Sequence, residues 1–268
     1  MKFWMELCKN SLKKTRNKIF FTDNTFDMKL YFIKAFKALL LSILTILFVA
    51  EKSTAMKIRK DSLKQLAIAR IAKGLNQNIA QTKINGGGGF LKDEAQMLSE
   101  ITYQTEVSDV LKHLAKKYNR KLYVVTYAGP ALVINDENEA ANLPNQMNQE
   151  AGALAQAIYD KTDFDDKSIL LLLYHQKVIT LGSEDYKGFG GVSYVSSNNA
   201  FTIAQTDLSE MVNRGNQLET GNDYLRSILY SLVRVLSQDN ATTIENNSNG
   251  LSTYAQAFLK DYSPSDDD

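Results

Sequence analysis

The chain of 268 residues contains one cysteine, Cys8, and two histidines, His113 and His175. A single cysteine cannot form a disulfide within the chain, and a cysteine this close to the N-terminus is not expected to serve as a nucleophile. Two histidines are too few for a histidine-rich metal site. Any metal-binding or acid–base chemistry in this protein would therefore have to use its carboxylates.

Several motifs of enzymes and nucleic-acid-binding proteins are also missing. No Gly-x-Ser-x-Gly occurs, so the sequence does not support a hydrolase nucleophile elbow. The glycine run in 85–89 has no Gly-Lys-Ser/Thr after it and no strand before it, which favours a flexible linker over a phosphate-binding loop. Residues 84–268 hold 14 basic and 25 acidic side chains. This acidic balance argues against nucleic acid as a partner.

The first 55 residues divide into two segments. Residues 1–27 are basic and polar, and the internal Met28 offers an alternative start that would leave this extension untranslated. Residues 28–55 have a lysine-containing start, an uncharged apolar stretch of 13 residues from Ala38 to Ala50, and small residues before a potential cut after Ala55. This pattern predicts a secretory signal peptide, and its alternative is an uncleaved signal anchor.

Residues 56–84 are predicted to form a basic helix. Apolar residues recur every four positions, and lysines and arginines surround them: Leu63, Ala67, Ile71, Leu75 and Ile79 form the apolar series. Such a helix can lie on an anionic membrane surface, or it can pack against the rest of the domain or a partner protein. The sequence leaves both alternatives open.

Residues 90–237 have the pattern of one α/β domain. A long helix is expected to end at Asn119, and further helices are expected over 151–161, at about 204–214 and over 224–236. Asn222 or Asp223 is expected to cap the last of them. Residues 121–128 form a strand rich in β-branched and aromatic residues, a short edge strand can form near 192–195, and 135–149 is predicted to be a polar loop. Residues 238–268 are expected to be a disordered acidic tail, within which 251–262 can form a short helix.

The apolar run from Ile169 to Leu173 predicts a buried central strand. We expect it to lie parallel to 121–128, because a helix separates the two strands. His175-Gln176 interrupts the apolar pattern and predicts a tight turn, followed by an antiparallel return strand from Lys177 to Leu181. His175 would then lie in a turn, and His113, off the apolar face of its helix, would be exposed.

This hairpin would bring acidic residues together at one edge of the sheet. The loop before the first strand and the loop after the second would place Asp163, Asp165 and Asp166 near Glu184 and Asp185, and Asp93 could join them. Closely spaced carboxylates repel one another unless a cation lies between them, and Ca²⁺ fits such an oxygen-rich site better than Mg²⁺. The alternative is an ordinary solvated acidic rim.

The order of these elements resembles the TPM domain family. The resemblance covers about 90–237 and rests on the segment DEAQMLS from Asp93 to Ser99, the strand beginning at Lys121, the leucine-rich strand Ile169–Leu173, and the strand Val178–Gly182 before the final helices. The family usually has Asn-Gly before the leucine-rich strand and an Asp-Arg-Arg-like turn after it. This chain has Asp166-Lys167 and His175-Gln176-Lys177 at those positions.

The resemblance implies a small three-layer α/β/α sandwich with a mixed sheet on the extracytoplasmic side of a membrane, tethered or secreted. Members of the family include acid phosphatases, calcium-binding proteins and accessory factors of membrane complexes. The favoured hypothesis is therefore a periplasmic or secreted non-catalytic module that binds an envelope or membrane protein or a membrane surface. The alternatives are a weak metal-dependent acid phosphatase, using Asp163, Asp165, Asp166 and Asp185, and a structural envelope protein.

Overall fold

The computed structural model describes eight ranges of the chain: 25–85, 89–130, 132–134, 137–180, 186–197, 203–215, 220–237 and 248–263. The chain divides into two compact units, residues 1–62 and residues 63–268. The predicted extension 1–27 lies almost entirely outside the described residues. So do three of the glycines in the predicted linker 85–89.

Helix α2 (Thr25–Asn85) contains both the predicted signal segment and the predicted basic helix. In the first unit, the apolar side chains of α2 that the structure describes include exposed ones: Leu41 is 69% exposed and Ile46 is 68% exposed. Among the helices described, none has both the length and the hydropathy needed to cross a membrane.

In the second unit, α2 packs against the α/β domain. Ile71 and Leu75 are fully buried, whereas Leu63, the first residue of the predicted apolar series, is 59% exposed. The interactions that tie this part of α2 to the domain include ion pairs from Lys64 to Glu150 and from Arg70 to Glu94, and a hydrogen bond from Asn78 to the Gly89 carbonyl. Of the two alternatives for this helix, packing on the domain is the one observed for its C-terminal part.

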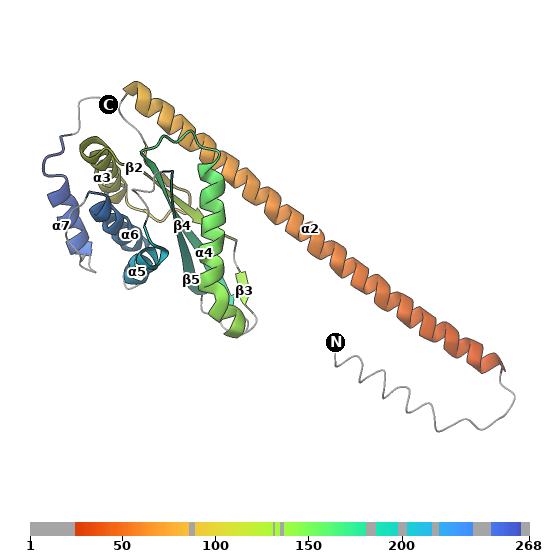
Figure 1. Cartoon of the computed structure of the whole chain (residues 1–268). Coiled ribbons are helices and arrows are strands. Elements are labelled where there is room, and N and C mark those ends of the chain that lie inside the picture. Colours follow the sequence, from red (N-terminus) through yellow and green to blue (C-terminus); the bar gives the residue numbers. More distant parts are fainter. Residues whose placement is uncertain are drawn as a thin grey trace. The chain divides into compact units, whose positions relative to one another are not determined.

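The described strands form one mixed sheet, shown in Figure 1. They are β1 (Leu91–Asp93), β2 (Lys121–Ala128), β3 (Leu132–Ile134), β4 (Ser168–Thr180) and β5 (Tyr186–Ser196). β2 pairs in parallel with the first part of β4, as predicted. β1, which the sequence analysis did not predict, pairs in parallel with β2. β3 pairs in parallel with the end of β4, and β5 pairs antiparallel along the length of β4.

The predicted hairpin at His175-Gln176 is wrong. β4 is 13 residues long, and it passes through His175 and Gln176 without a turn. His175 pairs with Ala128 on one side and with Gly190 on the other, so it lies inside the strand. The antiparallel partner of β4 is β5, which contains the predicted short edge strand near 192–195 and begins earlier, at Tyr186. Two polar residues do not end a strand whose neighbours supply backbone partners on both sides.

The helices lie on both sides of this sheet. α4 (Glu137–Tyr159) lies on one side, and α3 (Ile101–Tyr118), α6 (Gly221–Leu236) and α7 (Ser248–Phe258) lie on the other (Figure 1). α5 (Gln205–Gly215) packs against α6 and β5. The buried apolar core runs through these layers, and every residue of the predicted Ile169–Leu173 run is at most 1% exposed.

Two polar segments are more ordered than the sequence predicted. Residues 135–149 were expected to form a loop, but α4 begins at Glu137 and contains Pro144, with Leu143 and Met147 buried. Within the predicted tail 238–268, α7 and the residues up to 263 are ordered, which agrees with the predicted short helix but contradicts a wholly disordered tail. In both cases apolar residues at helical spacing reach the core despite polar neighbours.

Candidate functional site

Asp93 lies at the carboxyl end of β1, and its carboxylate holds the loop that follows. Oδ1 accepts the amide of Met97 at 2.9 Å and Oδ2 accepts the amide of Leu98 at 2.7 Å. The hydroxyl of Thr126, opposite Asp93 in β2, donates to Oδ1 and accepts the amide of Ala95 at 3.0 Å. The carboxylate and the hydroxyl together satisfy three backbone donors that a tight loop would otherwise leave unpaired.

Asn222, at the start of α6, extends this network. Its Oδ1 accepts the amide of Ser99 at 2.9 Å, and its Nδ2 donates to the Ser99 hydroxyl at 3.1 Å. The predicted helix cap is wrong in detail: Thr220 caps α6, and its hydroxyl accepts the amide of Asp223. Asn222 is buried and joins α6 to the loop instead.

The loop held in this way presents exposed side chains. Gln96 is exposed and has a φ of 54°, in the left-handed region that residues other than glycine seldom occupy. Ile101, the first residue of α3, has a side chain that is 80% exposed. We call residues 94–101, together with Thr220 and Gly221, the carboxyl-edge surface. In open α/β sheets, ligands bind outside the carboxyl ends of the strands, which is where this surface lies.

A buried charge network lies behind the carboxyl-edge surface. The Arg226 side chain is completely buried, and its Nε and Nη2 donate to Oε1 of Glu106 at 2.9 and 2.6 Å. Its Nη1 bonds Asp223 at 3.1 Å, and its guanidinium lies 4.1 Å from the ring centre of Tyr103. The Tyr230 hydroxyl also donates to Glu106, and burial raises the pKa of Tyr230. These contacts fix α3 and α6 to each other.

The predicted acidic site residues do not share one place. Asp165 lies before β4, where Oδ2 pairs with Lys121 at 2.5 Å and Oδ1 accepts the Ser168 hydroxyl at 2.6 Å. Burial alone would raise the pKa of Asp165, but the hydrogen bonds from Lys121 and Ser168 outweigh it, so the pKa is lowered. Asp165 therefore serves to fix the start of β4 beside the start of β2.

Asp163 and Asp166 are exposed in the same loop. The amide of Asp163 donates to Asn76 of α2 at 2.8 Å, so the loop is attached to that helix. Asp93 lies toward the other end of the sheet. The register places it five positions along β2 from Lys121, about 16 Å at the usual rise per strand residue.

Glu184 and Asp185 lie outside the described residues. They follow the end of β4 at Thr180, whereas Asp163, Asp165 and Asp166 precede its start, so the hairpin that would have brought them together does not exist. Within the ranges that the structure describes, no group of three or more carboxylate, histidine or cysteine side chains could hold a metal ion. Calcium binding stays a prediction, without the geometry that suggested it.

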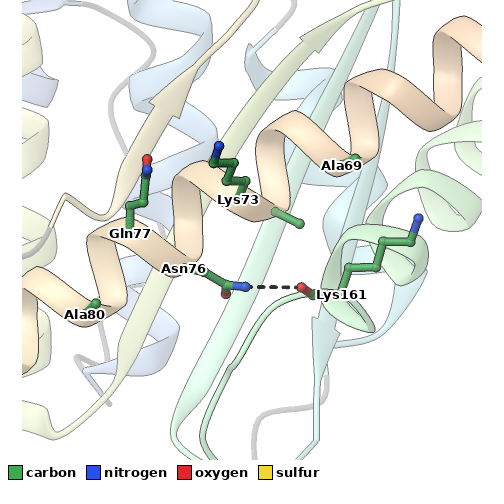
Figure 2. Close-up of a pocket in the computed structure, with 7 residues that line it drawn as sticks. Ala69, Lys73, Asn76, Gln77, Ala80 and Lys161 are labelled. Atoms are coloured by element: carbon green, nitrogen blue, oxygen red, sulfur yellow. Dashed lines mark hydrogen bonds between the residues drawn. The ribbon is translucent and has the colours of Figure 1, made fainter.

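A pocket lies along α2 and shares no lining residue with the carboxyl-edge surface. Ala69, Lys73, Asn76, Gln77, Ala80 and Lys161 line it (Figure 2). The amide group of Asn76 donates to the Lys161 carbonyl at 3.3 Å and accepts the Asp163 amide. The pocket lining is thus alanine, amide and lysine, and its best-placed polar group is already used to hold the adjacent loop.

Sequence reasoning identified Asp93, and it singled out Asn222 only as a possible helix cap. Arg226 and Glu106 were missed, because each lies on a helix whose apolar residues dominate the pattern. Each of these three helical residues finds a partner more than a hundred residues away. A charged residue at the centre of an apolar helical face, as Arg226 is on α6, is the one local clue to a buried ion pair.

No family model matches the chain, and no curated protein sequence matches it.

Proposed function

We propose that this protein is an exported TPM-like module, non-catalytic, that binds an envelope or membrane protein through its carboxyl-edge surface. The proposal includes a three-layer α/β/α arrangement like that of the TPM family. The mixed sheet with helices on both sides is compatible with that arrangement, and the Asp93–Ser99 segment on which the resemblance rests forms the candidate surface.

The observation that carries the proposal is the contrast between the inner and outer groups of this surface. Asp93, Thr126 and Asn222 use their polar atoms to hold the loop in one shape. The exposed groups of this surface include the apolar Ile101 and the amide Gln96, beside the polar Ser99 and Glu100. A fixed loop presenting an exposed apolar residue favours the recognition of a partner, since binding then costs little ordering entropy.

Export is proposed from the residues of 28–55. A charged start precedes an apolar stretch, and the described apolar side chains of this stretch are exposed, including Leu39, Leu41 and Ile46. A helical surface this apolar is seldom left in water, which favours an export signal or a membrane-embedded segment for its role. A mature protein that begins at Met56 would establish both export and cleavage.

The phosphatase alternative loses its main support. It needed the two acidic loops at one edge of the sheet, and the continuous β4 removes the hairpin that would have brought them there. Of that set, Asp165 already uses its carboxylate in local hydrogen bonds with Lys121 and Ser168. We therefore favour the binding module.

The binding proposal can be tested by photo-crosslinking in the native host. A photoreactive residue replaces Gln96, and in a control chain it replaces Gln256, an exposed residue of α7. We expect a crosslinked product in the membrane fraction from position 96 and none from position 256. Equal crosslinking at both positions, or none at either, would contradict a specific carboxyl-edge surface.

A charge variant gives a second test. Ile101→Glu places an acidic residue in the first turn of α3, where the helix dipole tolerates it, so the fold should be retained. Val235→Glu is the matched control, because Val235 is 53% exposed on α6. Crosslinking from position 96 should fall at least tenfold in the first variant and stay unchanged in the second.

A further inference from the structure

His113 is buried, against the expectation from the sequence. It lies on α3 with an exposed fraction of 3%. Its ring meets three aromatic rings: Phe258 at 4.9 Å and Tyr262 at 5.4 Å between ring centres, and Tyr118 at 6.4 Å. Within the described part of the chain, its buried Nε2 has no hydrogen-bond partner.

Two of these rings belong to the C-terminal segment 248–262, which contains α7. Leu251 and Ala255 are buried at the start and middle of this helix, and Phe258 is buried at its end. Polar attachments of this segment include a hydrogen bond from Arg226 to the Ser252 hydroxyl at 2.9 Å and an ion pair between Lys117 and Asp261 at 3.4 Å. At the end of α7, Phe258 packs against the rings of His113 and Tyr118.

The charges around His113 favour its neutral form. Burial lowers the pKa of His113, and the neighbouring Lys117 and Lys116 of α3 lower it further, while Asp261, beyond α7, opposes them. Asp109 lies one turn earlier on α3. A proton on Nε2 would place a cation in a buried aromatic cluster where that atom has no acceptor, which is costly.

We propose that protonation of His113 releases the segment 248–262 from α3, so that mild acid uncovers the α3–α6 surface beneath α7. The sign follows from linkage. The packing of segment 248–262 on α3 disfavours the charged form of His113. The neutral histidine therefore contributes fully to this packing above its unfolded pKa, about 6.5, and the contribution is lost as the pH falls below this value. This inference is independent of the carboxyl-edge surface, since it concerns α7 and α3 at another place on the domain.

Hydrogen exchange on the full chain tests the proposal. Exchange of the α7 amides is measured at pH 7.5 and at pH 5.5, and each rate is corrected for the intrinsic pH dependence of exchange. At pH 5.5 the opening equilibrium should rise by up to about tenfold, the limit for a group with an unfolded pKa near 6.5. His113→Phe keeps an aromatic ring without the proton and should abolish this rise.

The other histidine supplies the control. His175→Gln should leave the pH dependence of α7 exchange as in the wild type. The proposal is overturned if wild-type α7 exchange does not change between the two pH values, or if His113→Phe keeps the same change.

A second measurement does not require His113→Phe to fold. In the His175→Gln chain the single remaining histidine can be titrated by NMR. We expect the His113 resonance to titrate with a midpoint below pH 6.5. A midpoint at or above 6.5 would contradict the proposal.

Discussion

Asn222 and Ser99 form two hydrogen bonds with each other, although 123 positions separate them in the chain. Through this pair the start of α6 holds the end of the loop that Asp93 organises. The carboxyl-edge surface therefore depends on two elements that fold from distant parts of the sequence, and each can be tested by substitution.

Asn222→Ala should lower the free energy of unfolding by about 1–3 kcal/mol, because it leaves the partly buried Ser99 amide without its acceptor. Urea denaturation measures the loss. Asn145→Ala is the matched control, an exposed asparagine on α4 whose replacement should be neutral or slightly stabilising. Equal effects of the two changes would show that the Asn222–Ser99 pair contributes nothing specific.

Gly191→Ala should be destabilising by about 1–3 kcal/mol, since β5 and α4 touch there. A Cβ at this position would lie 2.3 Å from the Met147 carbonyl oxygen and 2.6 Å from its carbon, both backbone atoms that cannot move alone. Gly152→Ala offers a control within α4 itself, where an added Cβ meets nothing within 4 Å. That change should stabilise the helix by about 0.5–1 kcal/mol. Thermal unfolding of the two variants should shift in opposite directions.

Arg226→Met should cost about 3–5 kcal/mol, because it leaves Glu106 partly buried and without its cation. Combining it with Glu106→Gln removes the uncompensated charge, so the double variant should be more stable than Arg226→Met alone. The exposed Arg59 gives a control, where a change to methionine should alter stability by less than about 0.5 kcal/mol. A double variant no more stable than the single one would argue against a charge penalty at this site.

Asp165 makes stability depend on pH in the acid range. Its pKa is lowered in the folded state, so it stabilises the fold above its unfolded pKa and this contribution disappears as the pH falls below that value. Asp165→Asn should reduce stability at pH 7 by less than about 1 kcal/mol, because the side chain is 44% exposed. In urea titrations the difference from the wild type should shrink below about pH 4. A difference that stays the same below about pH 4 would contradict this role of Asp165.

Local patterns predicted the strands of this fold where apolar runs were unbroken. Residues 121–128 and Ile169–Leu173 lie in β2 and β4 as expected, and the parallel pairing followed from the helix between them. The prediction failed at His175-Gln176, because the partners that keep β4 extended there lie in β5. Gly188 and Gly190 stand opposite this part of β4, and glycines that look like a loop in sequence serve here as strand partners.

The candidate site could be predicted only in part from the sequence, for a similar reason. Asp93 could be singled out because its segment resembles a family motif, but its role depends on Thr126 and on Asn222, which only the folded chain brings near. His113 was expected to be exposed because its own helix gives no reason to bury it. Its burial comes from α7, at the far end of the sequence.

The uninterrupted β4 also bears on how the chain is made. Synthesis proceeds from the N-terminus, so the apolar residues Ile169–Leu173 emerge before β5 can pair with them. During that interval, β4 is an unpaired apolar edge of the kind that joins other chains into aggregates. Any fragment ending before Tyr186 would keep that edge permanently open. Fragments for expression should therefore extend past Ser196, and a newly made chain needs protection until β5 closes the sheet.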